Sequence, residues 1–345
     1  MFIFIGHKTT KMLRILRFSV LLFLLGCNST SNVVNNDEQE IDPKEYDYTI
    51  VFGSCNDQEN PQPLWQPILA NNPDAFIWGG DNIYADTPDM EKMKEMYDFQ
   101  KNVEEYQQLV NSTVMLGTWD DHDFGSNNAG KEWDKKAESQ QLFLDFMNVP
   151  EDDSRRDREG VYYSQDLNAD GKTIKVILLD TRYFRDPINE GREGIILGEA
   201  QWSWLENELN NSTADYNIIM SSIQVLSRQH RFEKWANFPE EREHLLDLIV
   251  SSEIKNPIII SGDRHISEFS KMDIDGLEAP LYDFTSSGMT HAYENFNGEP
   301  NMYREGEVIF QLSFGVLNFD FENEEVNMQM RGVENALLQE TSVKF

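Results

Sequence analysis

Residues 117–128 of the chain read GTWDDHDFGSNN, a stretch in which three carboxylates surround one histidine. The carboxylates belong to Asp120, Asp121 and Asp123, and the histidine is His122. A short apolar segment precedes the stretch and a glycine lies within it, which is typical of a loop at the end of a strand. Carboxylates this close together repel one another and raise each other's pKa unless a cation lies among them. The stretch therefore predicts a metal site.

Three more polar segments follow apolar runs in the same way. They are GSCN at 53–56, GGDNIY at 79–84 and SGDRH at 261–265. Loops beyond the carboxyl ends of strands converge on the ligand crevice in α/β sheets, and glycines let the backbone turn sharply there. The sequence therefore predicts that the four loops share one site.

The elements that must position these loops alternate between short apolar runs and longer amphipathic ones, which is typical of an α/β domain. Helices are expected over 62–71, 89–111, 198–210 and 239–252. Strands are expected over 48–52, 75–78, 114–119, 160–164, 174–179, 217–220, 257–260, 281–284, 308–313 and 326–330. The simplest account is one domain with stacked sheets and helices outside.

The segment DLNADG at 166–171 has the spacing with which an EF-hand calcium loop begins. Its twelfth position is Ile177, where that loop requires a bidentate glutamate. The pair Asp170 and Gly171 is typical of a tight hairpin turn. We therefore expect a β-hairpin here rather than a calcium site.

The composition is that of a globular protein with an acidic surface. The chain has 345 residues, of which 39% are hydrophobic, and this is enough apolar material for a large core. It carries 61 acidic against 29 basic residues, a net charge of −32. Such a surface repels nucleic-acid backbones and offers no basic footprint for DNA or RNA. We interpret the acidity as a solubilising surface.

The first 27 residues have the layout of a bacterial lipoprotein signal peptide. Four basic side chains between Lys8 and Arg17 precede an apolar run at 18–25 that is too short to span a bilayer. LLGC at 24–27 resembles a lipobox, which predicts lipidation of Cys27; with an ordinary signal peptide, cleavage would leave Cys27 free. We expect a lipid-anchored protein of the bacterial cell envelope, facing the periplasm or the cell surface.

Residues 28–45 are polar and lack aromatic side chains, as expected of a flexible tether, and the folded domain is expected over 46–345. If Cys27 carries lipid, Cys55 is left without a disulfide partner, because the chain has only two cysteines. Cys55 is then buried filler, a nucleophile or a metal ligand.

The four loops together resemble the alkaline phosphatase D family, a branch of the calcineurin-like metallophosphoesterase superfamily. The superfamily's blocks read D-x-H, G-D-x-x-D, G-N-H-[DE] and G-H-x-H. The corresponding segments here are SCN at 54–56, GDNIY at 80–84, DDHD at 120–123 and GDRH at 262–265, and DTR at 180–182 and YDFTSSG at 282–288 are also similar to the family. The resemblance implies a layered αββα sandwich, with two stacked mixed sheets and helices outside, that hydrolyses phosphate esters.

The resemblance also implies the ligands of a first metal ion. Cys55, Tyr84 and His265 would join Asp81 around it, and thiolate, phenolate and imidazole donors suit Fe³⁺. The alternatives are that Cys55 is buried filler and that Tyr84 is an ordinary packed tyrosine.

Carboxylates alone would hold a second metal ion, namely Asp121 and Asp263 with Asp81 bridging. Hard oxygen ligands favour Ca²⁺, and Mg²⁺ or Mn²⁺ also fits them. The acidic stretch at 117–128 is then tolerable because cations neutralise it. For Asp123 we expect a capping role, and the role of Asp120 stays open.

Asp121 and His122 are the catalytic candidates that the resemblance implies. In the superfamily the corresponding histidine follows a metal ligand and faces the substrate, where it either donates a proton to the leaving oxygen or stabilises the phosphoryl transition state. Three arginines are candidates to bind substrate oxygens, because guanidinium matches phosphate bidentately, and a structural ion pair is the alternative for each: Arg182, Arg228 and Arg264. The other histidines are expected to be structural (His291) or on the surface (His230 and His244).

The implied function is hydrolysis of phosphate esters, with small phosphomonoesters as the first choice of substrate. A phosphodiesterase acting on phospholipid head groups or similar diesters is the alternative within the same class, because a lipid anchor on Cys27 would place it near a membrane. A non-catalytic surface lipoprotein that binds metal is the alternative from another class. The sequence gives no indication of an oligomeric state.

Overall fold

The structure is a computed structural model that describes residues 46–188 and 193–345. The expected signal peptide at 1–27, the lipidation site Cys27 and the tether at 28–45 lie outside the described residues and stay predictions. None of the helices in the described ranges is long and apolar enough to cross a membrane.

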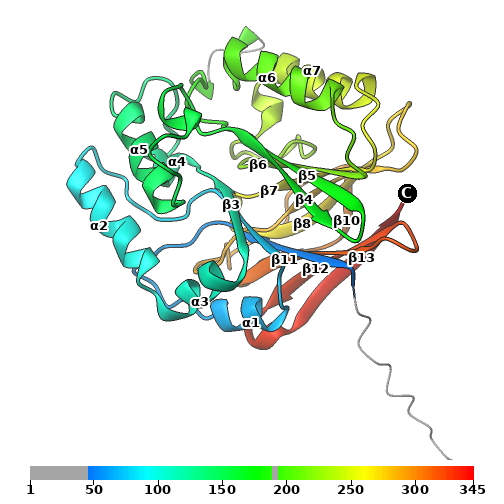
Figure 1. Ribbon diagram of the computed structural model, residues 1–345, viewed down its shortest axis with the longest axis horizontal. Helices are drawn as coiled ribbons and strands as arrows, with labels where there is room; N and C mark the ends of the chain where they lie inside the picture. Colours follow the sequence, from blue (N-terminus) through cyan, green and yellow to red (C-terminus); the bar gives the residue numbers. More distant parts are fainter. Residues whose placement is uncertain (1–45, 189–192) are drawn as a thin grey trace, which may run out of the picture. The chain divides into compact units, whose positions relative to one another are not determined.

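Two mixed β-sheets form the centre of the domain (Figure 1). The first has the strand order β13-β12-β11-β1-β2-β3, with β1 (Tyr48–Gly53), β2 (Ala75–Gly79), β3 (Val114–Thr118), β11 (Ser313–Asp320), β12 (Glu325–Gly332) and β13 (Leu337–Lys344). The second has the order β10-β8-β9-β7-β6-β5-β4, with β4 (Tyr163–Ala169), β5 (Lys172–Leu178), β6 (Tyr216–Ser221), β7 (Pro257–Ser261), β8 (Ser267–Met272), β9 (Leu281–Thr285) and β10 (Arg304–Ile309).

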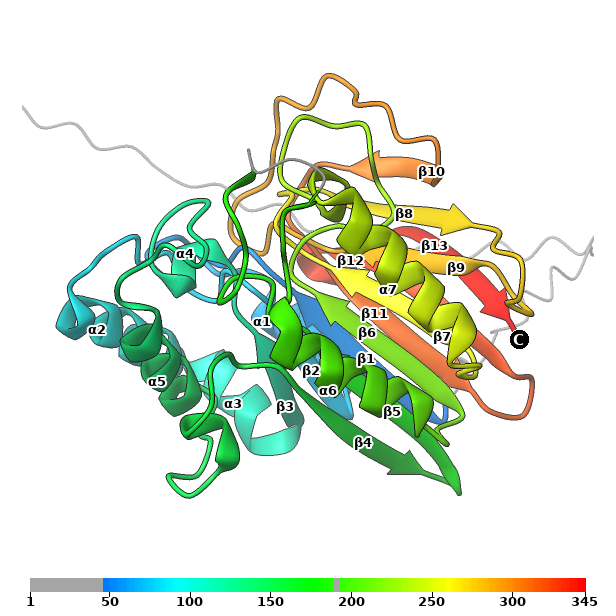
Figure 2. The same cartoon turned by 90° about the horizontal axis from the view of Figure 1, so that it is seen from above.

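Helices cover the outer face of each sheet. They are α1 (Trp65–Ala70), α2 (Met90–Lys101), α3 (Glu104–Ser112), α4 (Asp121–Phe124), α5 (Lys136–Phe146), α6 (Gly198–Asn210) and α7 (Pro239–Ser251). In Figure 1, α6 and α7 lie above the second sheet and α1 and α3 lie below the first, and Figure 2 shows α2, α3 and α5 grouped at one side. The expected αββα sandwich is confirmed.

The apolar strands are buried on both faces, which explains their continuous hydrophobic runs. On β1, Ile50 and Phe52 pack into the core between the sheets, whereas Val51 packs against the cluster under α1 and α2. On β6, Met220 points into the same central core and Ile219 packs under α6 and α7. Side chains alternate between the two faces of a strand, so each run contributes to two hydrophobic layers.

Three expected elements are wrong in their extent. The strand expected over 160–164 begins and ends later, because β4 runs over Tyr163–Ala169. The single helix expected over 89–111 is two helices, α2 and α3, because Val103 has an extended backbone. At the end of α2, the side-chain Nδ2 of Asn102 donates to Asp98 O at 2.7 Å. The strand expected over 308–313 is also divided: β10 ends at Ile309 in the second sheet, and β11 begins at Ser313 in the first. The chain changes sheets where the sequence shows one apolar run.

Two strands, β8 and β13, are not expected from the sequence. Both are short of apolar side chains, and β13 is an edge strand whose outer face is polar. The expected hairpin between β4 and β5 is confirmed, with a turn at Asp170 (φ +49°) and Gly171 (φ +80°). Positive φ at both central residues is the type I′ geometry.

Parallel pairing brings the polar loops together. β1, β2 and β3 run parallel in the first sheet, and β7 runs parallel to β6 and β9 in the second. Their carboxyl ends therefore lie at the same edge of the sandwich. At this edge a Cβ on Gly262 would lie 2.6 Å from Ser54 Oγ and 2.7 Å from Gly79 O, so only glycine lets these three loops approach so closely.

Candidate metal centre

The first group of candidate ligands lies where β1 and β2 end. Donor atoms of Cys55, Asp81 and His265 lie within 4.8 Å of one another. Cys55 Sγ is 3.4 Å from Asp81 Oδ2, and Tyr84 Oη is 3.3 Å from the same oxygen and 3.0 Å from His265 Nε2. The four residues expected around the first metal therefore converge on one point.

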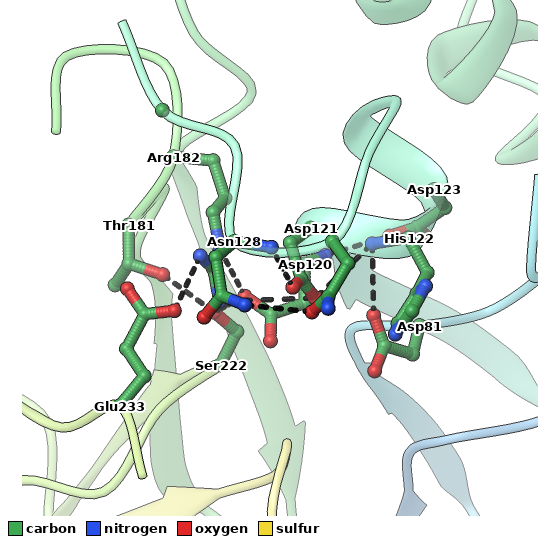
Figure 3. Close-up of polar contacts among 12 residues, drawn as sticks. Asp81, Asp120, Asp121, His122, Asp123, Asn128, Thr181, Arg182, Ser222 and Glu233 are labelled. Carbon is green, nitrogen blue, oxygen red and sulfur yellow. Dashed lines mark hydrogen bonds and ion pairs between the residues drawn. The ribbon is translucent and has the colours of Figure 1, made fainter. Parts of the chain in front are cut away.

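A second group consists only of carboxylates and shares Asp81 with the first. Donor atoms of Asp81, Asp120, Asp121 and Asp263 also lie within 4.8 Å of one another. Figure 3 shows Asp81 on one side of Asp120 and Asp121, with Arg182 on the other side. Asp81 belongs to both groups, and its bridging role stays a prediction; Asp120 is a further carboxylate within reach.

Four of these candidate ligands have a backbone conformation that residues with a side chain rarely adopt. The φ angle is +58° at Cys55, +50° at Asp81, +65° at Asp263 and +55° at His265. Such a residue costs of order 1–3 kcal/mol and persists only where its surroundings hold it, which is typical of functional sites. The strained backbone turns these side chains toward a common centre.

The acidic groups are held in an environment that disfavours their charged forms. Burial, followed by the charges of Cys55 and Asp121, raises the pKa of Asp81 well above its usual value. Burial, followed by Asp120 and Asp121, does the same to the pKa of Asp263. Burial and the Asp263 charge raise the pKa of the Cys55 thiol to about 12. Within the described residues, neighbouring positive charge therefore does not offset the effect of burial on the pKa values of Asp81, Asp263 and Cys55.

Two cations fit this arrangement. In the described parts of the chain, no lysine or arginine lies within ion-pair distance of the carboxylates of Asp81 and Asp263. The His265 imidazole is neutral, because burial and the neighbouring His291 lower its pKa to about 3, and a neutral imidazole is the form that binds metal. A cation among these groups would favour the ionised carboxylates and thiolate. The donor chemistry therefore fits a metal pair.

His122 lies at the rim of the cluster on the short helix α4. Its ring stacks on that of Tyr84 with 4.1 Å between centroids, and its Nδ1 lies 2.7 Å from Asp86 Oδ2. Burial lowers the pKa of His122, but the hydrogen bond to Asp86 and the charge of Asp121 outweigh burial, so the net pKa is raised. The imidazole is thus fixed in orientation and favoured in its protonated form.

Asp123 caps α4, as expected. Its Oδ1 accepts from Asp120 N at 2.7 Å, and its Oδ2 accepts from the Asn82 side chain at 2.5 Å. Burial raises the pKa of Asp123 to about 8. This carboxyl holds the loop that carries Asp121 and His122. It belongs neither to the two ligand groups above nor to a third, in which a ring nitrogen of His122 lies within 4.8 Å of donor atoms of Asp81 and Asp121.

Arg182 is fully buried in a charge network rather than turned toward solvent. Its Nε donates to Asp120 Oδ1 at 2.5 Å and its Nη1 to Glu233 Oε2 at 2.7 Å, and Arg185 Nη1 lies 3.1 Å from Glu233 Oε1. Figure 3 shows Arg182 and Glu233 beside the carboxylates of Asp120 and Asp121. The geometry favours the structural ion pair for Arg182 over contact with substrate, and it gives Asp120 its partner.

The other two arginines differ in position. Arg264 lines the cavity above the ligand groups, where it forms an ion pair with Glu299. Arg228 is exposed and is not among the residues that line this cavity. Of the three arginines expected to bind substrate, only Arg264 is therefore placed at the cavity wall.

The three remaining histidines of the described residues differ in burial and in distance from the candidate ligands. His244 is exposed on α7, as expected. The expectation of a surface position for His230 is wrong, because it is only 5% exposed and neither ring nitrogen has a hydrogen-bond partner. His291 lies beside the candidate ligands His265 and Tyr84, with ring centroids 4.3 Å and 4.8 Å away.

The cavity over the ligand groups has a volume of ≈ 680 Å³. Asp81, Asp121, His122, Asp263 and His265 line its floor and sides, as do residues that the sequence did not indicate: Asn127, Asn128, Arg231, Phe232, Glu233 and Tyr293. A second cavity of ≈ 540 Å³ lies around Tyr216 and Pro257, at the amino ends of β6 and β7, and holds none of the candidate residues.

Asp86, the partner of His122, was also not indicated by the sequence. It lies in the loop after β2, has φ +42°, and accepts from Asn127 N at 2.9 Å as well. Its position two residues after the GDNIY segment at 80–84 is the one feature of the sequence that could have indicated it. Glu233 gave no signal of its own, because its partners Arg182 and Arg185 lie about 50 residues away in the chain.

Fold and site together define a metallophosphoesterase-like protein, and comparison with known proteins identifies the family. Residues 50–329 match the model of the PhoD-like phosphatase family, to which the chain belongs. The chain is 27% identical over 285 residues to alkaline phosphatase D of Bacillus subtilis (strain 168). That alignment covers 66% of this chain and 47% of the relative, so the chain spans about half the length of this protein.

Solved structures agree with the fold. The structure of PhoD superposes with a TM-score of 0.68 at 16% identity, covering 87% of this chain and 70% of that one. A dimetal phosphatase from Danio rerio gives 0.53 at 13% identity, covering 87% of this chain and all of that one, and GAP50 of Plasmodium gives 0.55 at 11% identity with coverage of 87% and 90%. The predicted family resemblance is confirmed.

Proposed function

We propose that the protein is a metal-dependent hydrolase of phosphate esters that prefers phosphomonoesters. The observation that carries the proposal is the pair of ligand groups sharing Asp81 beneath His122. Membership of the PhoD-like phosphatase family supports it. A structural metal site has no need of an open cavity of ≈ 680 Å³ or of an oriented histidine at its edge.

Cys55, Asp81, Tyr84 and His265 would hold Fe³⁺, because an anionic thiolate and phenolate favour the ferric ion. Asp81, Asp121 and Asp263 would hold Ca²⁺, with Mg²⁺ or Mn²⁺ as alternatives for the same oxygen ligands. When bound, such a pair supplies Lewis acidity to a phosphate ester and lowers the pKa of water.

The chain's own contribution centres on His122. Its protonated form can donate a proton to the leaving oxygen of the ester, which avoids release of an alkoxide. Asp86 fixes the ring through Nδ1, which leaves Nε2 as the nitrogen for the proton transfer. His122 N also donates to Asp81 Oδ1 at 3.3 Å and to Asp121 Oδ1 at 3.1 Å, so the histidine and the ligands are held as one unit.

The direct test uses the chain from residue 28 onward, purified without added metal. Elemental analysis should find iron near one per chain in the natural sequence and little in Cys55→Ala. Release of phosphate from phenyl phosphate and release of phenol from methyl phenyl phosphate would separate monoesterase from diesterase activity. His122→Asn should lower turnover about 10²- to 10⁴-fold with unchanged metal content. Bound metal without turnover of either ester would support a non-catalytic binding lipoprotein instead.

We also propose attachment to the bacterial cell envelope through lipid on Cys27. The signal-peptide layout of residues 1–27 and the polar stretch 28–45 support this. Expression in a bacterium that processes lipoproteins should place the protein in the membrane fraction, and Cys27→Ser should abolish both acylation and membrane retention. Release of unacylated natural protein into the soluble fraction would contradict the anchor.

A further inference from the structure

One wall of the cavity combines an aromatic ring with two guanidinium groups. Arg231 and Phe232 come from the loop before α7, and Arg264 comes from the loop after β7. Arg264 Cζ lies 4.4 Å and Arg231 Cζ 4.8 Å from the centroid of the Phe232 ring, and the Tyr293 ring meets the same ring edge-on at 6.0 Å. Guanidinium groups at this distance are attracted to the face of the ring. We name residues 231, 232 and 264 the cationic wall.

The cationic wall is attached to the buried charge network next to it. Glu233 follows Phe232 directly and is held by Arg182 at 2.7 Å and Arg185 at 3.1 Å. Lys234 Nζ donates to Phe232 O at 2.9 Å. Arg231 and Phe232 are therefore placed by buried neighbours, although Arg231 itself is exposed.

The charges of the cationic wall are only partly balanced. Arg264 is paired with Glu299, but no carboxylate in the described ranges lies within ion-pair distance of Arg231. His230 lies in the same positively charged surroundings. Burial, followed by the charges of Arg264 and Lys234, lowers its pKa to about 2. In a chain with a net charge of −32, an exposed and unbalanced cation facing the cavity is a specific feature.

Resting on the proposed hydrolase function, we propose that Arg231 binds a second anionic group of the substrate, carried by the leaving group. The scissile phosphate belongs with the ligand groups and His122, and no hydrogen bond or ion pair described here joins Arg231 to those residues. A carboxylate or second phosphate on the leaving group would meet the Arg231 guanidinium, and its apolar part would pack on Phe232. The preferred substrates are thus organic phosphates with a further negative charge.

Equilibrium binding tests the inference without depending on turnover. The probes are phosphonocarboxylates with two to five carbons, each beside the alkylphosphonate of equal length, titrated calorimetrically into the metal-loaded protein. Arg231→Gln is the test variant. Arg228→Gln is the matched control, because Arg228 is an exposed arginine of the same loop that does not line the cavity.

For at least one chain length, Arg231→Gln should weaken binding of the phosphonocarboxylate about fivefold and leave the alkylphosphonate within about twofold, a size typical of a partly exposed charge pair. Arg228→Gln should change neither. Equal losses for both probe classes, no loss for any phosphonocarboxylate, or the same loss in Arg228→Gln would each overturn the inference. Failure of the hydrolase proposal is recognised separately, as absent turnover of simple esters by a protein that still discriminates the probes.

Discussion

Two groups of buried charge lie side by side at the edge of the sandwich, and the chain balances them differently. In the network of Asp120, Arg182, Glu233 and Arg185, each carboxylate has a guanidinium partner from the chain itself. In the ligand groups around Asp81, carboxylates, a thiol and a phenol face one another, and no lysine or arginine of the described residues forms an ion pair with Asp81 or Asp263. The network pairs its charges within the chain, although Arg182 Nη2 and Arg185 Nε have no hydrogen-bond partner among the described residues. The ligand groups instead have the donor atoms that suit a metal ion.

This difference in charge pairing distinguishes residues that stabilise the fold from residues that can bind a metal ion. A buried charge that is fully paired has little left to offer a substrate, whereas a buried acid without a partner keeps its affinity for a cation. The network also supports its neighbour: Asn128 N donates to Asp121 Oδ2 at 2.5 Å, and Asn128 O accepts from Arg185 at 2.5 Å. We call the first group the balanced network and the second the unbalanced group. Through Asn128, the balanced network positions Asp121, a candidate ligand in the unbalanced group.

Removal of Arg182 should have the largest effect on stability. Arg182→Met leaves Asp120 and Glu233 buried with one partner fewer, and breaking a buried pair costs about 3–5 kcal/mol. We expect this loss in the free energy of unfolding by denaturant, with and without metal. The double variant Arg182→Met, Glu233→Gln should lose less than the sum of the two single variants. A variant of unchanged stability with a raised KM would instead mean that Arg182 contacts substrate.

Metal removal should destabilise the protein in a manner that depends on pH. The pKa values of Asp81 and Asp263 are raised above those of the unfolded chain, near 4, so the metal-free native state binds more protons than the unfolded state. The contribution of these two carboxyl groups to stability is therefore greatest at acid pH and is lost as the pH rises through their folded pKa values. Asp121, whose pKa is lowered by Arg182 and His122 despite burial, contributes in the opposite direction.

Bound cations remove the penalty on the ionised carboxylates, so the difference in Tm between metal-loaded and chelated protein should widen as the pH rises above the unfolded pKa of about 4. Differential scanning fluorimetry from about pH 4 upward measures it. Arg228→Gln is the control in which the pH trend should persist, because Arg228 is exposed and does not line the cavity. A difference that stays constant or narrows with pH would show that the ligand groups are balanced without metal.

The sequence predicts the unbalanced group well and the balanced network poorly. Cys55, Asp81, Asp121 and His265 each follow an apolar strand directly, so a local pattern places them at one sheet edge. Glu233 comes from a loop without such a pattern, and its pairing with Arg182 depends on tertiary structure alone. Local periodicity indicates what a strand end carries, but not which distant loop folds over it.

The errors in the fold have the same cause. The helical period of residues 89–111 continues through Asn102, although the extended backbone of Val103 ends the helix there. Apolar side chains of both α2 and α3 pack in the cluster under the first sheet. β8 is not predicted from the sequence because it contains few apolar residues. It forms a strand because it pairs with β9 and β10. Elements defined by long-range pairing leave little trace in a local pattern.

Replacement of Asp86 should have the smallest effect and gives the most specific test. Like Asp120, Asp86 is a carboxylate with a partner from the chain, but its partner is the catalytic candidate His122. Asp86→Asn keeps a hydrogen-bond acceptor for His122 Nδ1 and removes the charge. We expect kcat to fall about tenfold with little change in KM or metal content, since the ring is less well oriented and less readily protonated. The loss should be greater for phosphate esters of alkyl alcohols than for 4-nitrophenyl phosphate, whose leaving group needs no proton. Equal losses for both substrates would leave His122 as a group that stabilises charge on the phosphoryl oxygens and would remove it as the proton donor.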